Sequence, residues 1–134
     1  MERVDLRTPQ NQIVRKKYSL PRNRRLHHAK AFSAVFRYRH QVRGNYVQVY
    51  AKPNGLSFSR LGLIVSKKVE RSAVKRNRIK RILRETFRTF QSCDNAVQMD
   101  WVMRQQLPIS AEISRQLIAE IRLLMQQLQK CHDS

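Results

Sequence analysis

The sequence has 134 residues, with 28 Lys or Arg against nine Asp or Glu, so its formal net charge is +19. This length allows about one small domain with a modest core, and so large a positive surplus favours a polyanionic partner over neutral or cationic ones. No apolar run approaches the ~20 residues that a membrane span needs, and no secretion signal is visible at the N-terminus, so we expect a cytoplasmic protein with no membrane partner.

The chain begins with a polar, basic stretch, residues 1–20, that lacks sustained periodicity. We expect a flexible arm there and a single α+β domain over residues 21–134. Apolar residues at helical intervals predict a helix near 29–38. A strand is predicted at 45–51, because aliphatic side chains alternate there with residues that carry a ring or an amide. We expect this second set to share the opposite face of the strand: Tyr46, Gln48 and Tyr50.

The second half of the chain alternates between strands and helices. An apolar run around 61–65 is typical of a central strand buried on both faces, and Ser72 is a candidate N-cap for a basic helix over 72–90. Alternation predicts a shorter strand within 96–104, and an apolar stripe predicts a final helix at 111–129. The order α-β-β-α-β-α predicts a two-layer sandwich of a small mixed sheet with about three helices.

The predicted basic helix carries charges of one sign on its outer face. Its four like-charge pairs at i,i+4 cost roughly 0.2–0.5 kcal/mol each, whereas each large side chain of its apolar stripe returns roughly 1.5–3 kcal/mol on burial. Burial of the apolar stripe therefore outweighs the repulsion, and the helix can form. A helix face that only contacts water, however, usually carries both positive and negative side chains. A phosphate-rich ligand accounts for the pattern, because neutralised phosphates release counterions. Asn77 adds an amide that both donates and accepts hydrogen bonds beside these cations.

Residues that could carry catalysis or bind a metal are scattered. The nine acids form no pair on one face beside a histidine, and neither a zinc-ligand spacing nor a glycine-rich phosphate loop is present. We therefore predict no catalytic residue and no metal ligand. Cys93 and Cys131 form no CxxC pair, and we expect free thiols because disulfides are rare in a reducing compartment.

The stretch GLIVSKKVERSAVKRNRIKRILRETFR, residues 62–88, resembles the signature of the bacterial ribonuclease P protein subunit. That signature is a strand ending in Ser-Lys-Lys, a short link, and a helix that carries Arg-Asn-Arg-Ile-Lys-Arg. A weaker likeness extends from about Pro21 to Gln129 and includes AFSAVF, where the family has two aromatic residues four positions apart. The first twenty residues fall outside the resemblance.

The resemblance implies a role in tRNA 5′ processing. In that family the RNA subunit cleaves precursor tRNA, while the protein binds substrate and stabilises the RNA. It implies that this chain binds the catalytic RNA and the 5′ leader. We predict no obligate protein partner, and because the chain has no metal-ligand spacing, we expect Mg²⁺ in the holoenzyme to be held mainly by RNA phosphates and the substrate. The RNA-binding residues that the matching motif implies, with Arg84 added from the charge pattern, are Ser66, Lys67, Lys68, Arg76, Asn77, Arg78, Lys80, Arg81 and Arg84.

The family also has a groove between its first helix and the sheet, and this groove holds the single-stranded leader. The resemblance places Phe32, Phe36 and Tyr50 there. The strand pattern supports Tyr46, Gln48 and Tyr50 independently, because bases stack on aromatic rings for about 1–3 kcal/mol each without strong sequence preference. Ordinary core packing is the alternative for the two phenylalanines, and both roles are compatible.

Two other functions fit the charge. A ribosomal or general RNA-binding protein without a processing role would be equally basic, although it would not need the RNRIKR helix beside an aromatic groove. A DNA-binding protein could place the helix over 72–90 in a major groove. Competition between duplex DNA and leader-bearing RNA would separate the last possibility from the other two.

Overall fold

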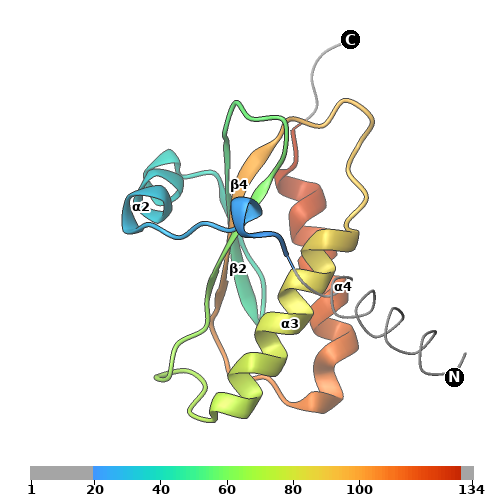
Figure 1. Ribbon diagram of the computed structural model, residues 1–134. Coiled ribbons are helices and arrows are strands. Elements are labelled where there is room, and N and C mark those ends of the chain that lie inside the picture. The colour runs from blue at the N-terminus through green and yellow to red at the C-terminus, as the bar shows by residue number, and fades with distance from the viewer. Residues whose placement is uncertain (1–19, 131–134) are drawn as a thin grey trace, which may run out of the picture.

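The computed structural model describes residues 20–130, which form a four-stranded sheet with helices on both faces (Figure 1). The predicted arm lies outside the described residues except for Leu20, whose side chain is buried in the main core. In order along the chain, the elements are η1 (Arg22–Arg24), α2 (Ala29–Tyr38), β1 (Gln41–Arg43), β2 (Val47–Pro53), β3 (Arg60–Ile64), α3 (Ala73–Thr89), β4 (Met99–Gln105), η2 (Ala111–Ile113) and α4 (Ser114–Leu128).

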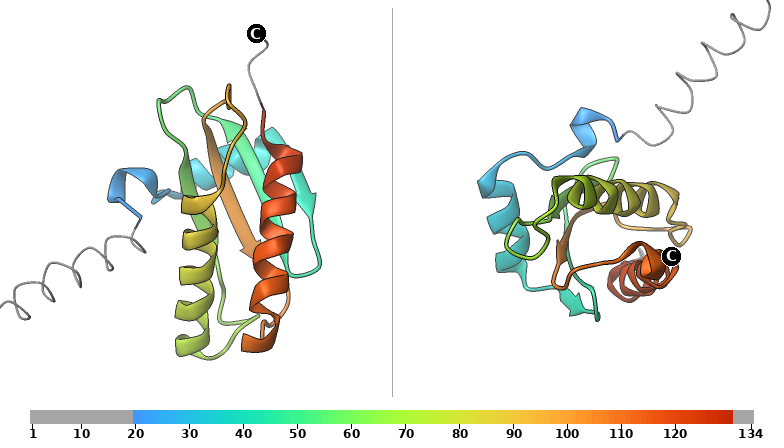
Figure 2. Two further views of the ribbon diagram at one scale, coloured as in Figure 1. Left: turned by 90° about the vertical axis from the view of Figure 1, so that its right-hand side faces the viewer. Right: turned by 90° about the horizontal axis from the view of Figure 1, so that it is seen from below.

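The predicted fold class and element order are confirmed, and the helix predicted at 29–38 has the bounds of α2. Helices α3 and α4 lie side by side on one face of the sheet, and the shorter α2 lies on the other (Figure 2). Strand β1 was not predicted, because three residues are too few to show a period. Arg39 ends α2 in the left-handed conformation, with φ 62°.

The strands run in the order β1-β2-β4-β3. Strand β2 is antiparallel to both β1 and β4, whereas β3 is parallel to β4. A parallel pair needs a crossover connection, and α3 provides it. Strand β3 lies at the edge of the sheet, so the prediction of a central strand was wrong. The chain around Leu26 covers this edge, since the Leu26 N–H donates to the carbonyl of Leu61 at 2.9 Å. This cover explains why an edge strand has so apolar a sequence.

Two clusters of apolar side chains lie on the two faces of the sheet. The larger one, beneath α3 and α4, includes Val49, Ile79 and Trp101. The smaller one lies beneath α2 and contains Leu26, Val35, Tyr50 and Val102.

Gly62 allows α2 to approach the second face closely. A Cβ at this position would lie 2.6 Å from two atoms of the Phe32 ring. The ring therefore occupies the space above Gly62.

The expectation of free thiols was wrong for Cys93, which is disulfide-bonded. The only other cysteine of the sequence, Cys131, lies outside the described residues. The N–H of Cys93 donates to Gln129 Oε1 at 3.2 Å, and the N–H of Val97 donates to the carbonyl of Lys130 at 2.7 Å. The loop after α3 is thus held against the chain that follows α4, a proximity that cysteine spacing alone does not reveal.

Candidate nucleic-acid interface

Helix α3 forms as its pattern predicts. Ser72 Oγ accepts a hydrogen bond from the Lys75 N–H at 3.3 Å, which caps the first turn. The side chains of Ile79, Leu83 and Phe87 are buried against the sheet and α4. Their burial directs the polar positions of the helix outward, so the predicted core face is confirmed.

Most of the cations on α3 have no carboxylate partner. Within residues 20–130 the ion pairs are Arg60 with Asp100, at 2.7 Å, and Arg88 with Glu85, at 2.5 Å. Arg88 is therefore the only α3 cation that is neutralised by a described residue. Asn77 and Arg81 are exposed. The charge of this helix remains available to an external anion.

Two arginines of the RNRIKR stretch also hold the fold together. Arg76 Nη1 donates to the backbone carbonyls of Glu70 and Arg71, each at 2.9 Å. Arg78 Nη2 donates to the carbonyl of Ile109 at 3.0 Å, on the side of the helix that faces α4. A guanidinium has five N–H donors, so both retain donors, but substitutions here would affect folding as well as binding.

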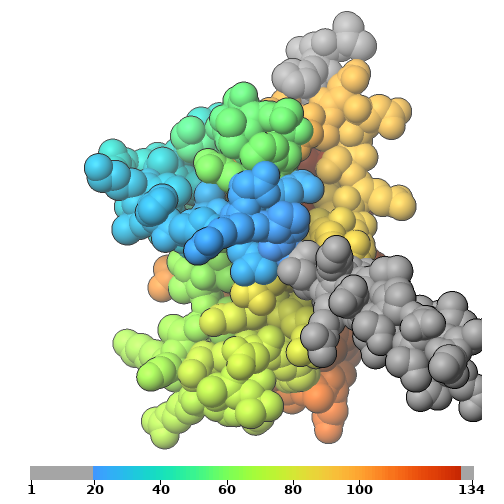
Figure 3. All heavy atoms as spheres, viewed as in Figure 1, coloured from blue at the N-terminus to red at the C-terminus, as the bar shows by residue number. Residues whose placement is uncertain are grey.

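Lys80 and Arg84 lie on another side of α3, where they line a cleft of about 250 Å³ together with Arg25 and His27. We call this the basic cleft. It lies where the segment of residues 20–27 passes between α3 and α2 (Figure 3). Partial burial lowers the pKa of Arg84, and the nearby charge of Arg25 lowers it further. Two guanidinium groups without an intervening carboxylate favour an anion at this position.

The predicted residues at the end of β3 form a tight turn. The backbone carbonyl of Ser66 accepts from the Glu70 N–H at 2.9 Å, and Ser66 Oγ accepts from the Val69 N–H at 3.3 Å. These bonds leave Lys67 and Lys68 exposed. The turn therefore presents two cations beside the sheet.

A groove of about 610 Å³ lies along the sheet face that α2 covers only in part. We call it the sheet groove. Among the predicted residues it contains Gln48, Ser66 and Lys68. Gln48 accepts a hydrogen bond from Gln106 at 3.0 Å and donates one to Gln41 at 2.7 Å. The groove thus combines a row of amides with cations at its rim.

Sequence reasoning missed several residues of the sheet groove, chiefly Arg43, Arg104 and Gln106. Arg104 is directly opposite Gln48 in the β2–β4 pairing and is exposed. The alternation of β4 could have placed Arg104 on the face away from the α3–α4 core. Its pairing with Gln48 could not be predicted, because nothing in a single sequence fixes the register of two strands so far apart in the chain.

The predicted aromatic residues separate onto two faces. Phe36 packs edge-on against Tyr50, with ring centroids 4.8 Å apart, and both belong with Phe32 to the cluster under α2. Phe32 and Phe36 are half-buried, so core packing and ligand contact remain compatible. Tyr46, by contrast, packs against the α3–α4 core. Its predicted position beside Tyr50 was wrong, because the chain bends at this residue and the strand alternation starts at Val47.

Similarity to known proteins identifies the family. A family model described as Ribonuclease P matches residues 20–129. The ribonuclease P protein component of Chromobacterium violaceum is 38% identical over 117 residues, which cover 87% of this chain and 95% of that protein. The ribonuclease P protein component of Nitrosomonas europaea is 39% identical over 106 residues, which cover 79% of this chain and 87% of that protein. The chain belongs to the ribonuclease P protein family.

Solved structures of ribonuclease P proteins have the same fold. The protein from Staphylococcus aureus is similar with a TM-score of 0.64 and 25% identity, over 76% of this chain and 92% of that one. The protein from Thermotoga maritima is similar with a TM-score of 0.55 and 25% identity, over 78% of this chain and 93% of that one. The chain is thus a ribonuclease P protein subunit, the non-catalytic partner of an RNA subunit in a tRNA-processing ribonucleoprotein.

Acidic side chains near the sheet are engaged within this ribonuclease P protein. Asp100 pairs with Arg60, and Glu120 accepts from three backbone N–H groups at the start of β2. In the described part of the chain, no group of three or more His, Cys, Asp or Glu residues could hold a metal ion. No helix among residues 20–130 is long and apolar enough to cross a membrane.

Proposed function

We propose that this chain binds the catalytic RNA through the outer face of α3 and the 5′ leader of precursor tRNA through the sheet groove. In this way it assists endonucleolytic removal of the leader, which gives the mature tRNA 5′ end. One observation supports the proposal most strongly. The cations of α3 other than Arg88 have no carboxylate partner among residues 20–130, and they lie on the same molecule as an open groove rimmed by Arg43, Lys68 and Arg104.

The α3 face suits a phosphate backbone. Asn77, Lys80, Arg81 and Arg84 offer donors that the fold does not use for ion pairs. Each neutralised phosphate of a nucleic acid releases condensed counterions, so the logarithm of affinity falls with the logarithm of salt concentration by about 0.7–0.9 per contact. An RNA bound here would relieve the repulsion between neighbouring cations that the free helix carries.

The sheet groove suits a single strand of variable sequence. Arg43, Lys68 and Arg104 at its rim provide charge for the backbone, while Gln48 and Gln106 provide amides. Amides donate and accept, so they can bind the edge of any base. Phe36, half-buried on the same sheet face, adds a ring on which a base can stack without strong sequence preference, whereas Tyr50 is only 8% exposed and supports Phe36 from the cluster beneath α2.

In this proposal the metal ions are bound by RNA and not by the protein. Ribonuclease P cleaves a phosphodiester bond, and we propose that the Mg²⁺ ions of the holoenzyme are held by phosphates of the catalytic RNA and the substrate. The protein would strengthen their binding indirectly, by fixing the RNA. The same proposal locates the complex in the cytoplasm, where bacterial tRNA precursors are made.

The affinity of the holoenzyme for precursor tRNA and for mature tRNA tests the leader assignment. Arg104→Ala removes a rim cation whose side chain makes no hydrogen bond to a described residue, and Arg115→Ala removes an exposed cation of α4 as a matched control. We expect Arg104→Ala to lower the preference for precursor tRNA about tenfold, since a hydrogen bond to a charged group contributes about 1.5 kcal/mol or more. An unchanged preference, or an equal loss in the control, would contradict the assignment.

A further inference from the structure

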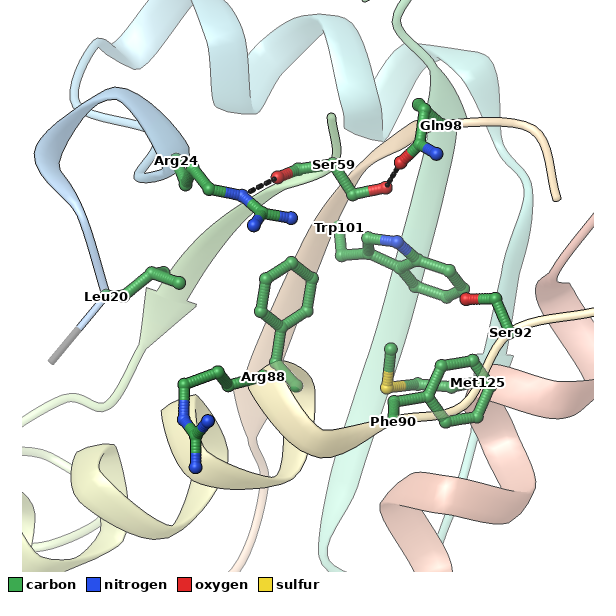
Figure 4. Close-up of a pocket in the computed structure, with 10 residues that line it drawn as sticks. Leu20, Arg24, Ser59, Arg88, Phe90, Ser92, Gln98, Trp101 and Met125 are labelled. Carbon is green, nitrogen blue, oxygen red and sulfur yellow. Dashed lines mark hydrogen bonds between the residues drawn. The ribbon is translucent and has the colours of Figure 1, made fainter. Parts of the chain in front are cut away.

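A third concave site lies between the N-terminal segment and the end of α3, away from the sheet groove. This pocket of about 120 Å³ is formed by η1, the start of β3, the end of α3 and α4 (Figure 4). Its walls combine the rings of Phe87, Phe90 and Trp101 with polar groups of Arg24, Ser59 and Gln98. We call it the aromatic pocket.

The aromatic walls are held rigidly. Trp101 is 4% exposed and sits in the main core, so its orientation is fixed by packing. The Phe90 and Trp101 ring centroids are 6.5 Å apart, with their planes inclined at 65°. Trp101 and Phe87, 4% and 8% exposed, therefore contribute little accessible surface, and the half-buried Phe90 presents more of the aromatic surface of the pocket.

The polar groups are also held in place. Ser59 Oγ donates to Gln98 Oε1 at 2.8 Å and accepts from the Met99 N–H at 3.0 Å. Arg24 Nε donates to the Ser59 carbonyl at 3.1 Å. These bonds leave the terminal nitrogens of Arg24 and the amide nitrogen of Gln98 without a hydrogen-bond partner among residues 20–130, while the Arg24 guanidinium lies 5.9 Å from the centroid of the Phe58 ring. Ordered donors of this kind reduce the entropy lost when a ligand binds.

Trp101 offers a further donor. Its indole nitrogen makes no hydrogen bond to the described part of the chain and is not among the fully buried polar atoms. Figure 4 shows the nitrogen-bearing edge of the ring turned toward Ser59 and Gln98. A flat ligand with acceptor atoms on its edge matches these donors.

The aromatic pocket continues the charged side of α3. Lys80 and Arg84 line the basic cleft, and Leu20 lies between the two sites and lines both. Arg88, which is paired with Glu85, lines the aromatic pocket one turn further along, so the unpaired cations on this path are Lys80 and Arg84. Residues four positions apart share one side of a helix. An RNA backbone that follows Lys80 and Arg84 would therefore reach the mouth of the pocket.

We propose that the aromatic pocket holds one unpaired nucleobase of the RNA that binds along α3. Rings for stacking, fixed donors for a base edge and nearby unpaired cations, here Lys80 and Arg84, for the adjoining phosphates are what unpaired RNA bases meet in protein sites. The inference rests on the RNA-binding function proposed above, but it concerns a site that the leader does not need.

Trp101 makes the site directly measurable, because it is the only tryptophan of the chain. Each of the four ribonucleoside 5′-monophosphates is titrated into the full-length protein, with ribose 5-phosphate as the control that lacks a base. We expect saturable quenching of tryptophan fluorescence by the nucleotides and none by the sugar phosphate. Equal quenching by ribose 5-phosphate, or no saturable signal, would overturn the proposal.

A blocking variant tests the location. Ser92 is exposed at the rim of the pocket, so Ser92→Phe should fill the pocket without disturbing the core, and Gln91→Phe adds the same ring at the preceding exposed residue, which does not line the pocket. With melting temperatures matched, Ser92→Phe should abolish nucleotide quenching and weaken binding of the RNA subunit about 5- to 150-fold, which corresponds to one stacked base. Gln91→Phe should behave as the wild type.

The outcome separates this proposal from the leader assignment. Ser92→Phe should leave the ratio of precursor to mature tRNA affinity unchanged, and Arg104→Ala should leave nucleotide quenching unchanged. Nucleotide binding that persists in Ser92→Phe would refute the pocket and leave the leader assignment intact. Quenching that is lost only in Ser92→Phe would support the pocket even if leader binding failed.

Discussion

Removing charge from α3 should change stability and RNA binding in opposite directions. In the double variant Lys80→Gln and Arg84→Gln, glutamine keeps a polar stem and has nearly the helix propensity of the residues it replaces. Neither cation has a carboxylate partner among the described residues, so no ion pair is lost. The folded protein therefore loses only repulsion and some contact of the longer side chains.

The expected stabilisation follows from the spacing. The double variant removes three like-charge i,i+4 pairs, namely those that link Arg76, Lys80, Arg84 and Arg88. At 0.2–0.5 kcal/mol per pair, the free energy of unfolding should rise by about 0.6–1.5 kcal/mol at low salt. Because salt screens these charges, the gain should shrink at high ionic strength. Urea unfolding at two salt concentrations measures both effects.

Binding should respond in the opposite sense. If each cation neutralises one phosphate, loss of both lowers the slope of log affinity against log salt by about 1.4–1.8. The matched control is Arg115→Gln with Arg122→Gln, which removes two exposed cations of α4. An unchanged salt slope in the α3 variant, or a fall in stability of more than about 1 kcal/mol, would refute the view that these cations are kept for an external anion.

Three further substitutions test particular contacts. Gly62→Ala should lower the free energy of unfolding by about 1–3 kcal/mol in urea titration, because the added Cβ meets the Phe32 ring; a neutral result would show that α2 shifts freely. Phe36→Ala loses its edge contact with Tyr50 and should reduce both the melting temperature and the preference for precursor tRNA; a change in melting temperature alone would assign the ring to the core. Glu120→Ala leaves three backbone N–H groups without their carboxylate and should cost about 1.5–3 kcal/mol of stability, measured by urea unfolding; an unchanged midpoint would contradict this role.

Much of the fold could be predicted because local patterns determine it. The periodic apolar residues of α3 and the alternation of Val47 and Val49 are strong signals at short range. The apolar face of the helix and the aliphatic face of the strand are both buried, as predicted. The edge position of β3 depends on a segment that covers it from elsewhere in the chain, near Leu26. The prediction for Tyr46 failed because the chain bends at residues 45 and 46, so Tyr46 precedes the strand and does not follow its alternation of faces.

The candidate site could be predicted only where one segment supplies it. The cations of α3 lie together because a single helix carries them. The basic cleft and the sheet groove instead join distant residues, such as Arg25 with Arg84 and Gln48 with Arg104. Those neighbours follow from strand register and chain path, which a single sequence does not specify.

Cleavage of precursor tRNA by the RNA subunit at low Mg²⁺, with and without this protein, tests the central claim most directly. The wild-type protein should raise the rate of 5′-leader removal. The variant with Lys80→Gln and Arg84→Gln should require more protein for the same gain, and the protein alone should cleave nothing. No increase in 5′ processing by the wild-type protein, or cleavage by the protein without RNA, would contradict the account.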